Sequence, residues 1–345
     1  MTTVTDADPS ADETPPPPAD FAEALDRAIG LVDLDELLRL VDGRCAARDW
    51  GGLARLRERC DAGNDAGRQL WPAAAHAEYR LALEAPASHA GAVLTDGAGR
   101  FSPGPLPEVA AQHHEWRDLA AHVPPGAPGV LAAHERVVRG EDCRDPEPVG
   151  PAVLDLPLVL APWEPEYALA EYRSHDADFL SPARPVLAAV ELPRAGTRVD
   201  PDDTADALLE LVRAWTAGSD GRADVAVVDG GALDAVAALG PRQVRAAPID
   251  GRDAVAWMAW AAASGGAHGR RSGAAAGRFG AWWVLGALGG TLDEWPPDPD
   301  DLGAVLRGLS WLAWEADEPV LGWRLHLAVE DPARGRAWAI TAVDA

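Results

Sequence analysis

The stretch from Ser264 to Trp283 combines residue types that could bind an anion. Its glycines recur at every fourth position: Gly265, Gly269, Gly273 and Gly277. Three arginines lie among them: Arg270, Arg271 and Arg278. A glycine-rich approach to a helix leaves backbone N–H groups free, and together with the helix dipole these groups bind phosphate or carboxylate. The stretch follows neither the GxxxxGK[ST] nor the GxGxxG nucleotide-binding pattern, so an anion site is only one of two interpretations.

The other interpretation, which we favour, is a packed core helix. Residues four apart lie on one face of a helix. Glycine inside a helix costs about 1 kcal/mol relative to alanine, so a row of glycines calls for the close approach of another backbone. The arginines would then pair with carboxylates of the protein itself, which is very acidic.

Two aspartates, Asp229 and Asp250, follow predicted strands and precede glycine-containing turns. The order strand, helix, strand, helix, strand, helix over the middle of the chain predicts parallel crossover units. In such sheets ligands bind beyond the carboxyl ends of the strands, so these aspartates could bind a cation or a sugar hydroxyl. The alternative, which we favour, is that each caps the following helix.

The candidate ligand-binding residues are thus the two strand-end aspartates and four residues of the glycine-arginine stretch: Asp229, Asp250, Gly269, Arg270, Arg271 and Arg278. The sequence indicates no catalytic residue, no metal-ligand set and no cofactor. It contains neither GxSxG nor HEXXH, and its three cysteines form no CxxC pair. It contains no lysine, which excludes Schiff-base chemistry and a P-loop lysine.

The composition restricts the partners. The 345-residue chain has a formal net charge of −25, and all 30 basic residues are arginine. Strong negative charge argues against nucleic acid and anionic membranes, although a local basic patch stays open. No signal peptide and no apolar stretch of about 20 residues is evident, and unpaired cysteines are typical of a reducing compartment. We therefore expect a cytoplasmic protein with a protein partner.

Composition and periodicity predict three regions and a mixed α/β fold. Residues 1–20 form an acidic, proline-rich tail that we expect to be disordered. Residues 21–145 show helical periodicity, and residues 146–345 predict an α/β domain. This domain should end in an antiparallel meander over 309–315, 321–330 and 336–343. Four tryptophans are expected in the core of the meander: Trp311, Trp314, Trp323 and Trp338.

Three segments carry a resemblance. They are GGAHGRRSGAAAGRFGAWW, the following WPPDPDDLG, and the closing GWRLHLAVEDPARGRAWAITAVDA. Together they resemble a family of uncharacterised actinobacterial proteins, a domain of unknown function, over about the last quarter of the chain. His268 stands where that family is expected to carry tyrosine. The resemblance implies no assigned activity and no catalytic residues.

Two hypotheses on function follow from the sequence. The first is a non-enzymatic interaction or scaffold protein, with the helical half as an adaptor. The alternative is an α/β domain that binds, or acts on, an anionic or nucleotide-like small molecule near the strand-end aspartates and the arginines.

Overall fold

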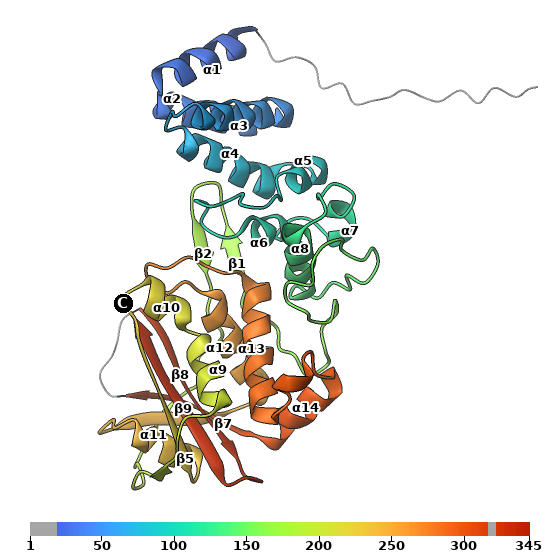
Figure 1. The fold of residues 1–345 in the computed structure, drawn as a ribbon. Helices are drawn as coiled ribbons and strands as arrows, with labels where there is room; N and C mark the ends of the chain where they lie inside the picture. The colour runs from blue at the N-terminus through green and yellow to red at the C-terminus, as the bar shows by residue number, and fades with distance from the viewer. Residues whose placement is uncertain (1–18, 317–321) are drawn as a thin grey trace, which may run out of the picture.

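The computed structural model describes residues 19–316 and 322–345 (Figure 1). The predicted tail falls almost entirely outside these residues. The described chain begins with helices stacked above a domain that contains a β-sheet (Figure 1). This arrangement confirms the predicted mixed fold, while the division into domains stays a prediction. No helix in the described ranges is both long and apolar enough to cross a membrane.

The helical region starts with short amphipathic helices whose first turns are capped by aspartates. Asp33 accepts a hydrogen bond from Glu36 N (3.0 Å), and Asp49 accepts one from Gly52 N (2.8 Å). The buried faces of these helices share one apolar core. The helices are α1 (Ala19–Leu31), α2 (Leu34–Ala46), α3 (Trp50–Asp65), α4 (Trp71–Glu84), α5 (Ala87–Ala92), α6 (Leu106–Ala111), α7 (Trp116–Leu119) and α8 (Ala127–Val137).

A two-stranded hairpin belongs to this core although it comes later in the chain. β1 (Ala170–Tyr172) pairs antiparallel with β2 (Ala177–Phe179). Ala170 and Tyr172 are buried in the core of the helical region. In Figure 1 the hairpin lies between the helices and the larger sheet.

The larger sheet is antiparallel throughout its described part, with strand order β3-β6-β7-β8-β9-β5-β4. The predicted parallel crossover units are therefore wrong. β5 and β6 do point the same way, but β9, β8 and β7 lie between them. The strands are β3 (Ala188–Val190), β4 (Thr197–Arg198), β5 (Arg222–Asp229), β6 (Val244–Ile249), β7 (Ser310–Ala316), β8 (Trp323–Asp331) and β9 (Arg336–Asp344). The last three strands confirm the predicted meander.

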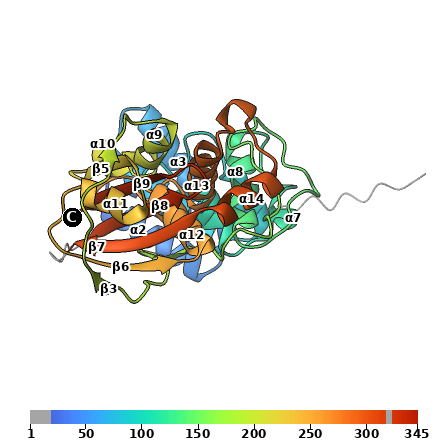
Figure 2. The same cartoon turned by 90° about the horizontal axis from the view of Figure 1, so that it is seen from below.

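Helices cover the two faces of the sheet unequally (Figure 2). Leu325, Leu327 and Val329 of β8 face the main core, whereas the intervening Ala328 faces a smaller core beneath α11 (Ala232–Ala238). The main core is closed by α9 (Asp203–Glu210), α10 (Arg213–Gly218), α12 (Gly251–Ala263), α13 (Ala274–Gly289) and α14 (Pro299–Gly308), with the 3₁₀ turn η1 (Leu292–Glu294) between the last two. This alternation follows from the two-residue period of a strand.

The tryptophans of the meander pack as expected, although on both faces of the sheet. Trp311 and Trp338 are buried in the main core, and Trp314 is buried in the smaller one. Trp323 is half-buried and stacks on Trp260 of α12, with ring centroids 4.9 Å apart. Aromatic packing therefore accounts for the tryptophan content of this region.

The glycine row does not lie on one helix, contrary to the sequence-based expectation. α13 begins at Ala274, while Gly265 and Gly269 lie in the turns before it. Gly273 precedes the helix with φ of 101°, a left-handed conformation that L side chains rarely adopt. Of the four glycines, Gly277 alone lies inside the helix with another backbone close to it, as the sequence predicted for the whole row. A Cβ there would lie 2.2 Å from the carbonyl oxygen of Ala259, so α12 and α13 pack backbone to backbone.

We predict that Gly277→Ala destabilises the protein by about 1–3 kcal/mol, because the new methyl group must push α12 away from α13. Gly43→Ala is the matched control. Gly43 lies inside α2 with nothing within 4 Å of its virtual Cβ, so alanine there should stabilise by a few tenths of a kcal/mol. Thermal melts of the two variants test this. A Gly277→Ala protein that melts as high as Gly43→Ala would contradict the close packing.

Candidate functional site

The N-terminus of α13 is occupied by two carboxylates of the helical region. Glu108 of α6 accepts two hydrogen bonds from Arg271 (2.8 and 2.7 Å) and a third from Ala274 N (3.2 Å). Glu135 of α8 accepts a hydrogen bond from Ala275 N (2.9 Å). The anions that this helix terminus attracts are thus the protein's own, and a ligand at Arg271 would have to displace Glu108.

Burial and neighbouring charge act on these two carboxyls in opposite directions. Burial by itself would raise the pKa of Glu108, but the Arg271 guanidinium, the hydrogen bond from Tyr172 and the charge of Arg139 together outweigh burial and lower it. For Glu135, burial and the negative charge of Glu108 together raise the pKa to about 7, although Arg139 lies 3.1 Å away. Glu108 therefore holds the negative charge, and Glu135 is its easily protonated neighbour.

Arg278 forms a second buried ion pair one turn further along α13. Its guanidinium donates two hydrogen bonds to Glu164 (2.7 and 2.8 Å), and both side chains are fully buried. Glu164 also accepts hydrogen bonds from Tyr167 and Trp282. Burial would raise the pKa of Glu164, but the hydrogen bonds and charge of Arg278 lower it.

The other residues expected to bind a ligand are dispersed. Asp250 caps α12 by accepting a hydrogen bond from Arg252 N (2.7 Å), as the favoured interpretation predicted. Asp229 instead pairs with Arg336 across the sheet (3.3 Å). Four strand spacings, about 19 Å, separate β5 from β6, so the two aspartates do not share a ligand.

Gly269 and Arg270 are held by neighbouring backbone. A Cβ at Gly269 would collide with the carbonyl oxygen of Gly265 at 2.1 Å, so this turn requires glycine. Arg270 donates a hydrogen bond to the carbonyl oxygen of Gly99 in the helical region (2.6 Å). Both residues therefore have structural roles in the turn that leads to α13.

A cleft of about 910 Å³ opens beside Asp250, between the helical region and α12. Its described charged lining consists of two arginines and four carboxylates: Arg139, Arg252, Glu166, Glu171, Asp250 and Asp253. The surplus of negative charge makes this cleft unfavourable for an anionic ligand.

A smaller pocket, of about 200 Å³, has the opposite charge balance. Three arginines line it: Arg184, Arg245 and Arg324. Glu315 supplies the carboxylate among its described lining residues. We call it the arginine pocket. It lies where β7 and β8 stop pairing, since their paired residues end at Ala313 and Leu327 although both strands continue. Trp257 and Leu187 add apolar walls.

Glu315 divides its charge between two of these arginines. It lies 3.6 Å from Arg184 and 3.5 Å from Arg324, while Arg245 donates a hydrogen bond to the carbonyl oxygen of Leu187 (2.9 Å). His326, which stacks on Trp314 at 4.7 Å, also lines the pocket. Burial and the positive charge of Arg324 together lower the pKa of His326 to about 4, so the ring is neutral near pH 7. Its two buried nitrogens lack hydrogen-bond partners of normal geometry.

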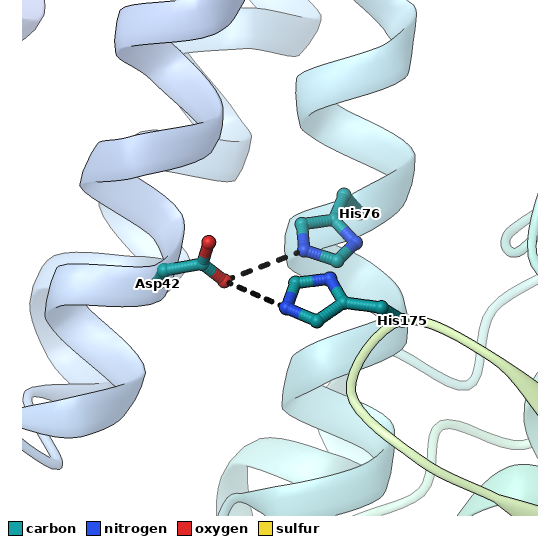
Figure 3. A group of neighbouring side chains, drawn as sticks. All are labelled: Asp42, His76 and His175. Carbon is teal, nitrogen blue, oxygen red and sulfur yellow. Dashed lines mark ion pairs between the residues drawn. The ribbon is translucent and has the colours of Figure 1, made fainter.

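Within residues 19–316 and 322–345, one group of side chains could hold a metal ion: Asp42 of α2, His76 of α4 and His175 in the turn of the hairpin (Figure 3). Oδ1 of Asp42 lies 3.7 Å from Nε2 of His76 and 3.8 Å from Nε2 of His175. The imidazole rings stack with centroids 5.5 Å apart. Both Nε2 atoms point toward the same carboxylate oxygen (Figure 3).

Sequence reasoning missed the arginine pocket and the Asp42–His76–His175 group. The members of each come from separate segments and have no motif spacing, so only the pairing of strands and the docking of the hairpin bring them together. The one signal visible in the sequence was the use of arginine in place of lysine, because arginine is the side chain that suits a buried or pocket-lining positive charge.

We predict a pH-dependent effect of Glu135→Gln. Because folding raises the pKa of Glu135, the folded state binds more protons than the unfolded state between about pH 4.5 and 7. The stability contributed by the raised pKa of Glu135 is therefore fully present below about pH 4.5 and is lost as the pH rises to about 7. Glutamine cannot ionise, so the stability of the variant relative to wild type should rise from pH 5 to pH 8 by on the order of 2–3 kcal/mol.

Denaturant titrations at the two pH values measure this difference. A Glu23→Gln variant, altered on the exposed side of α1, controls for the loss of one charge. A difference between the Glu135→Gln protein and wild type that does not change with pH would contradict the raised pKa.

We also predict that Arg278→Met destabilises the protein by about 3–5 kcal/mol, because it leaves the Glu164 carboxylate buried without its cation. The double variant Arg278→Met/Glu164→Gln should recover part of this loss, since no buried charge remains. Melting temperatures of the single and double variants decide the point. A double variant that melts no higher than the single one would show that lost packing, and not an unpaired charge, is the cause.

The comparisons with known proteins identify a family. A model described as a family of unknown function, DUF6183, matches residues 35–345. The match reaches through the helical region, so the resemblance inferred from the sequence was too narrow in covering only the last quarter. No curated protein and no solved structure matches the chain significantly. Since the matched region includes both the helices and the sheet, the chain belongs to the DUF6183 family.

Proposed function

We propose that this protein binds a small anionic molecule in the arginine pocket. The observation that carries the proposal is the local charge: three guanidinium groups surround a pocket with one carboxylate in its described lining, in a chain of net charge −25. Arginine presents a planar fork of donors that suits carboxylate and phosphate groups. Two surplus positive charges in the described lining of a pocket attract an anion, even in so acidic a protein.

The walls of the pocket define the ligand further. Trp257 and Leu187 present apolar surface, which suits a ligand with an apolar or aromatic body. The volume of about 200 Å³ is below the roughly 300–1,000 Å³ of pockets for drug-sized ligands, so the ligand is small.

Binding is a better account of this pocket than catalysis. The described lining groups that could transfer a proton are Glu315 and His326. Glu315 is engaged by two arginines, and the pKa of His326, lowered to about 4 by burial, makes it a weak base near neutral pH. The proposal retains the anionic ligand inferred from the sequence and moves it away from Arg271, Arg278 and the strand-end aspartates.

The interaction-protein hypothesis has one supporting feature in the helical region. Trp71 and Phe101 are 45% and 55% exposed and lie with ring centroids 4.1 Å apart. An exposed aromatic pair is a common anchor for a protein partner. This hypothesis stays second because no complementary surface indicates what would cover the pair.

We predict that small carboxylates, sulfonates or organic phosphates with an apolar body raise the melting temperature of the protein. At a hundred times its Kd, such a ligand stabilises the folded state by about 2.7 kcal/mol. For the best ligand, Arg245→Ala should weaken binding at least tenfold, and Glu315→Gln should strengthen it, because Glu315 competes with the ligand for Arg184 and Arg324. Calorimetric titration measures both effects.

Arg222→Ala is the matched control, since Arg222 is an exposed arginine at the start of β5 and does not line the pocket. Its affinity for the ligand should equal that of wild type. Affinities that fall equally in Arg222→Ala and Arg245→Ala, or that fall in Glu315→Gln, would refute a ligand held by the pocket arginines.

A further inference from the structure

The Asp42–His76–His175 group has the dimensions of a metal site that needs only a small contraction. Zinc binds imidazole nitrogen and carboxylate oxygen at about 2.0–2.2 Å in tetrahedral geometry, which places neighbouring ligand atoms about 3.3–3.5 Å apart. The two distances from Asp42 Oδ1 are 3.7 and 3.8 Å, and all three ligand atoms lie within 4.8 Å of one another. The Asp42–imidazole distances must shorten by about 0.2–0.5 Å, and the separation of the two imidazole nitrogens by at most about 1.5 Å, for the three atoms to reach this geometry.

The group is open to solvent on one side. The side chains of Asp42 and His175 are 47% and 67% exposed, whereas that of His76 is 19% exposed. An ion could therefore enter from solvent and keep water in its remaining coordination position, as in zinc sites with three protein ligands. The three cysteines, by contrast, are all buried.

Arg80 is the charged neighbour that could oppose an ion. Its Nη1 donates a hydrogen bond of 2.6 Å to the same Asp42 oxygen. Glu84 accepts two hydrogen bonds from the other side of this guanidinium (2.8 and 3.2 Å), so its charge is already matched. Asp42, Arg80 and Glu84 together carry a net charge of −1, which favours a cation. The bond from Arg80 also fixes the orientation of the carboxylate, as outer-shell partners of metal ligands do.

We propose that Asp42, His76 and His175 bind a divalent transition-metal ion, and that zinc suits the site. Two imidazoles and one carboxylate favour zinc, nickel or copper over magnesium or calcium, which prefer oxygen ligands alone. The ion connects helices α2 and α4 to a hairpin turn almost one hundred residues further along the chain. It therefore clamps the hairpin onto the helical region, and this role is independent of the arginine pocket.

The test is a calorimetric titration of tag-free, reduced protein with zinc chloride, in parallel with calcium chloride. We expect one saturable zinc site and a higher melting temperature with zinc. His175→Ala alters an exposed turn residue, so the variant should fold while its zinc affinity drops at least tenfold and the gain in melting temperature disappears. His268→Ala, which removes an exposed histidine from another turn, should bind zinc as wild type does.

Cobalt(II) substitution separates this site from the cysteines. Coordination by nitrogen and oxygen gives no thiolate-to-cobalt charge-transfer absorption, whereas a cysteine ligand does. The proposal is overturned by a thiolate band, by an unchanged zinc affinity in His175→Ala, by the absence of saturable zinc binding, or by calcium binding as tightly as zinc.

Discussion

The contact on which the rest of the structure depends is the meeting of α13 with two carboxylates of the helical region. The first N–H groups of a helix have no partners inside the helix, and burying them unpaired would be costly. Glu108 and Glu135 supply acceptors to Ala274 N and Ala275 N, and Arg271 neutralises Glu108. Each partner in this network is buried at the junction, and a buried charge left unpaired is costly. The two halves of the chain must therefore form the whole network when they pack together.

The hairpin β1–β2 completes this junction. The hydroxyl of Tyr172 donates a hydrogen bond of 2.6 Å to Glu108, and Arg271 lies over the ring of Phe179 at 5.1 Å. The same hairpin carries His175 to the surface group with Asp42 and His76. A metal ion bound there would act on the segment that closes the buried network, so the proposed metal binding would be linked through the hairpin to the docking of the two halves.

The use of arginine follows from the acidic composition. Arg271 and Arg278 each neutralise one buried carboxylate, and their planar forks allow two parallel hydrogen bonds in each pair. The arginine pocket differs because three arginines and one carboxylate make up its described charged lining. The arginines beside α13 are each matched by a carboxylate of the protein, whereas the described lining of the arginine pocket has a surplus of positive charge. This difference is the physical reason to propose ligand binding in the pocket and not on α13.

The sequence by itself determined the local features whose cause is local. The helix periodicity, the Asp250 cap, the strands of the meander and the packing of its tryptophans all depend on a few adjacent residues, and each was predicted. It also indicated that the arginines would pair with the protein's own carboxylates. Only the tertiary structure decided which carboxylates those are, because Glu108 and Glu164 lie more than one hundred residues from their partners. The antiparallel sheet order, the breaking of the glycine row at Gly273, the arginine pocket and the histidine pair likewise depend on long-range pairing, which residue spacing along one chain does not specify.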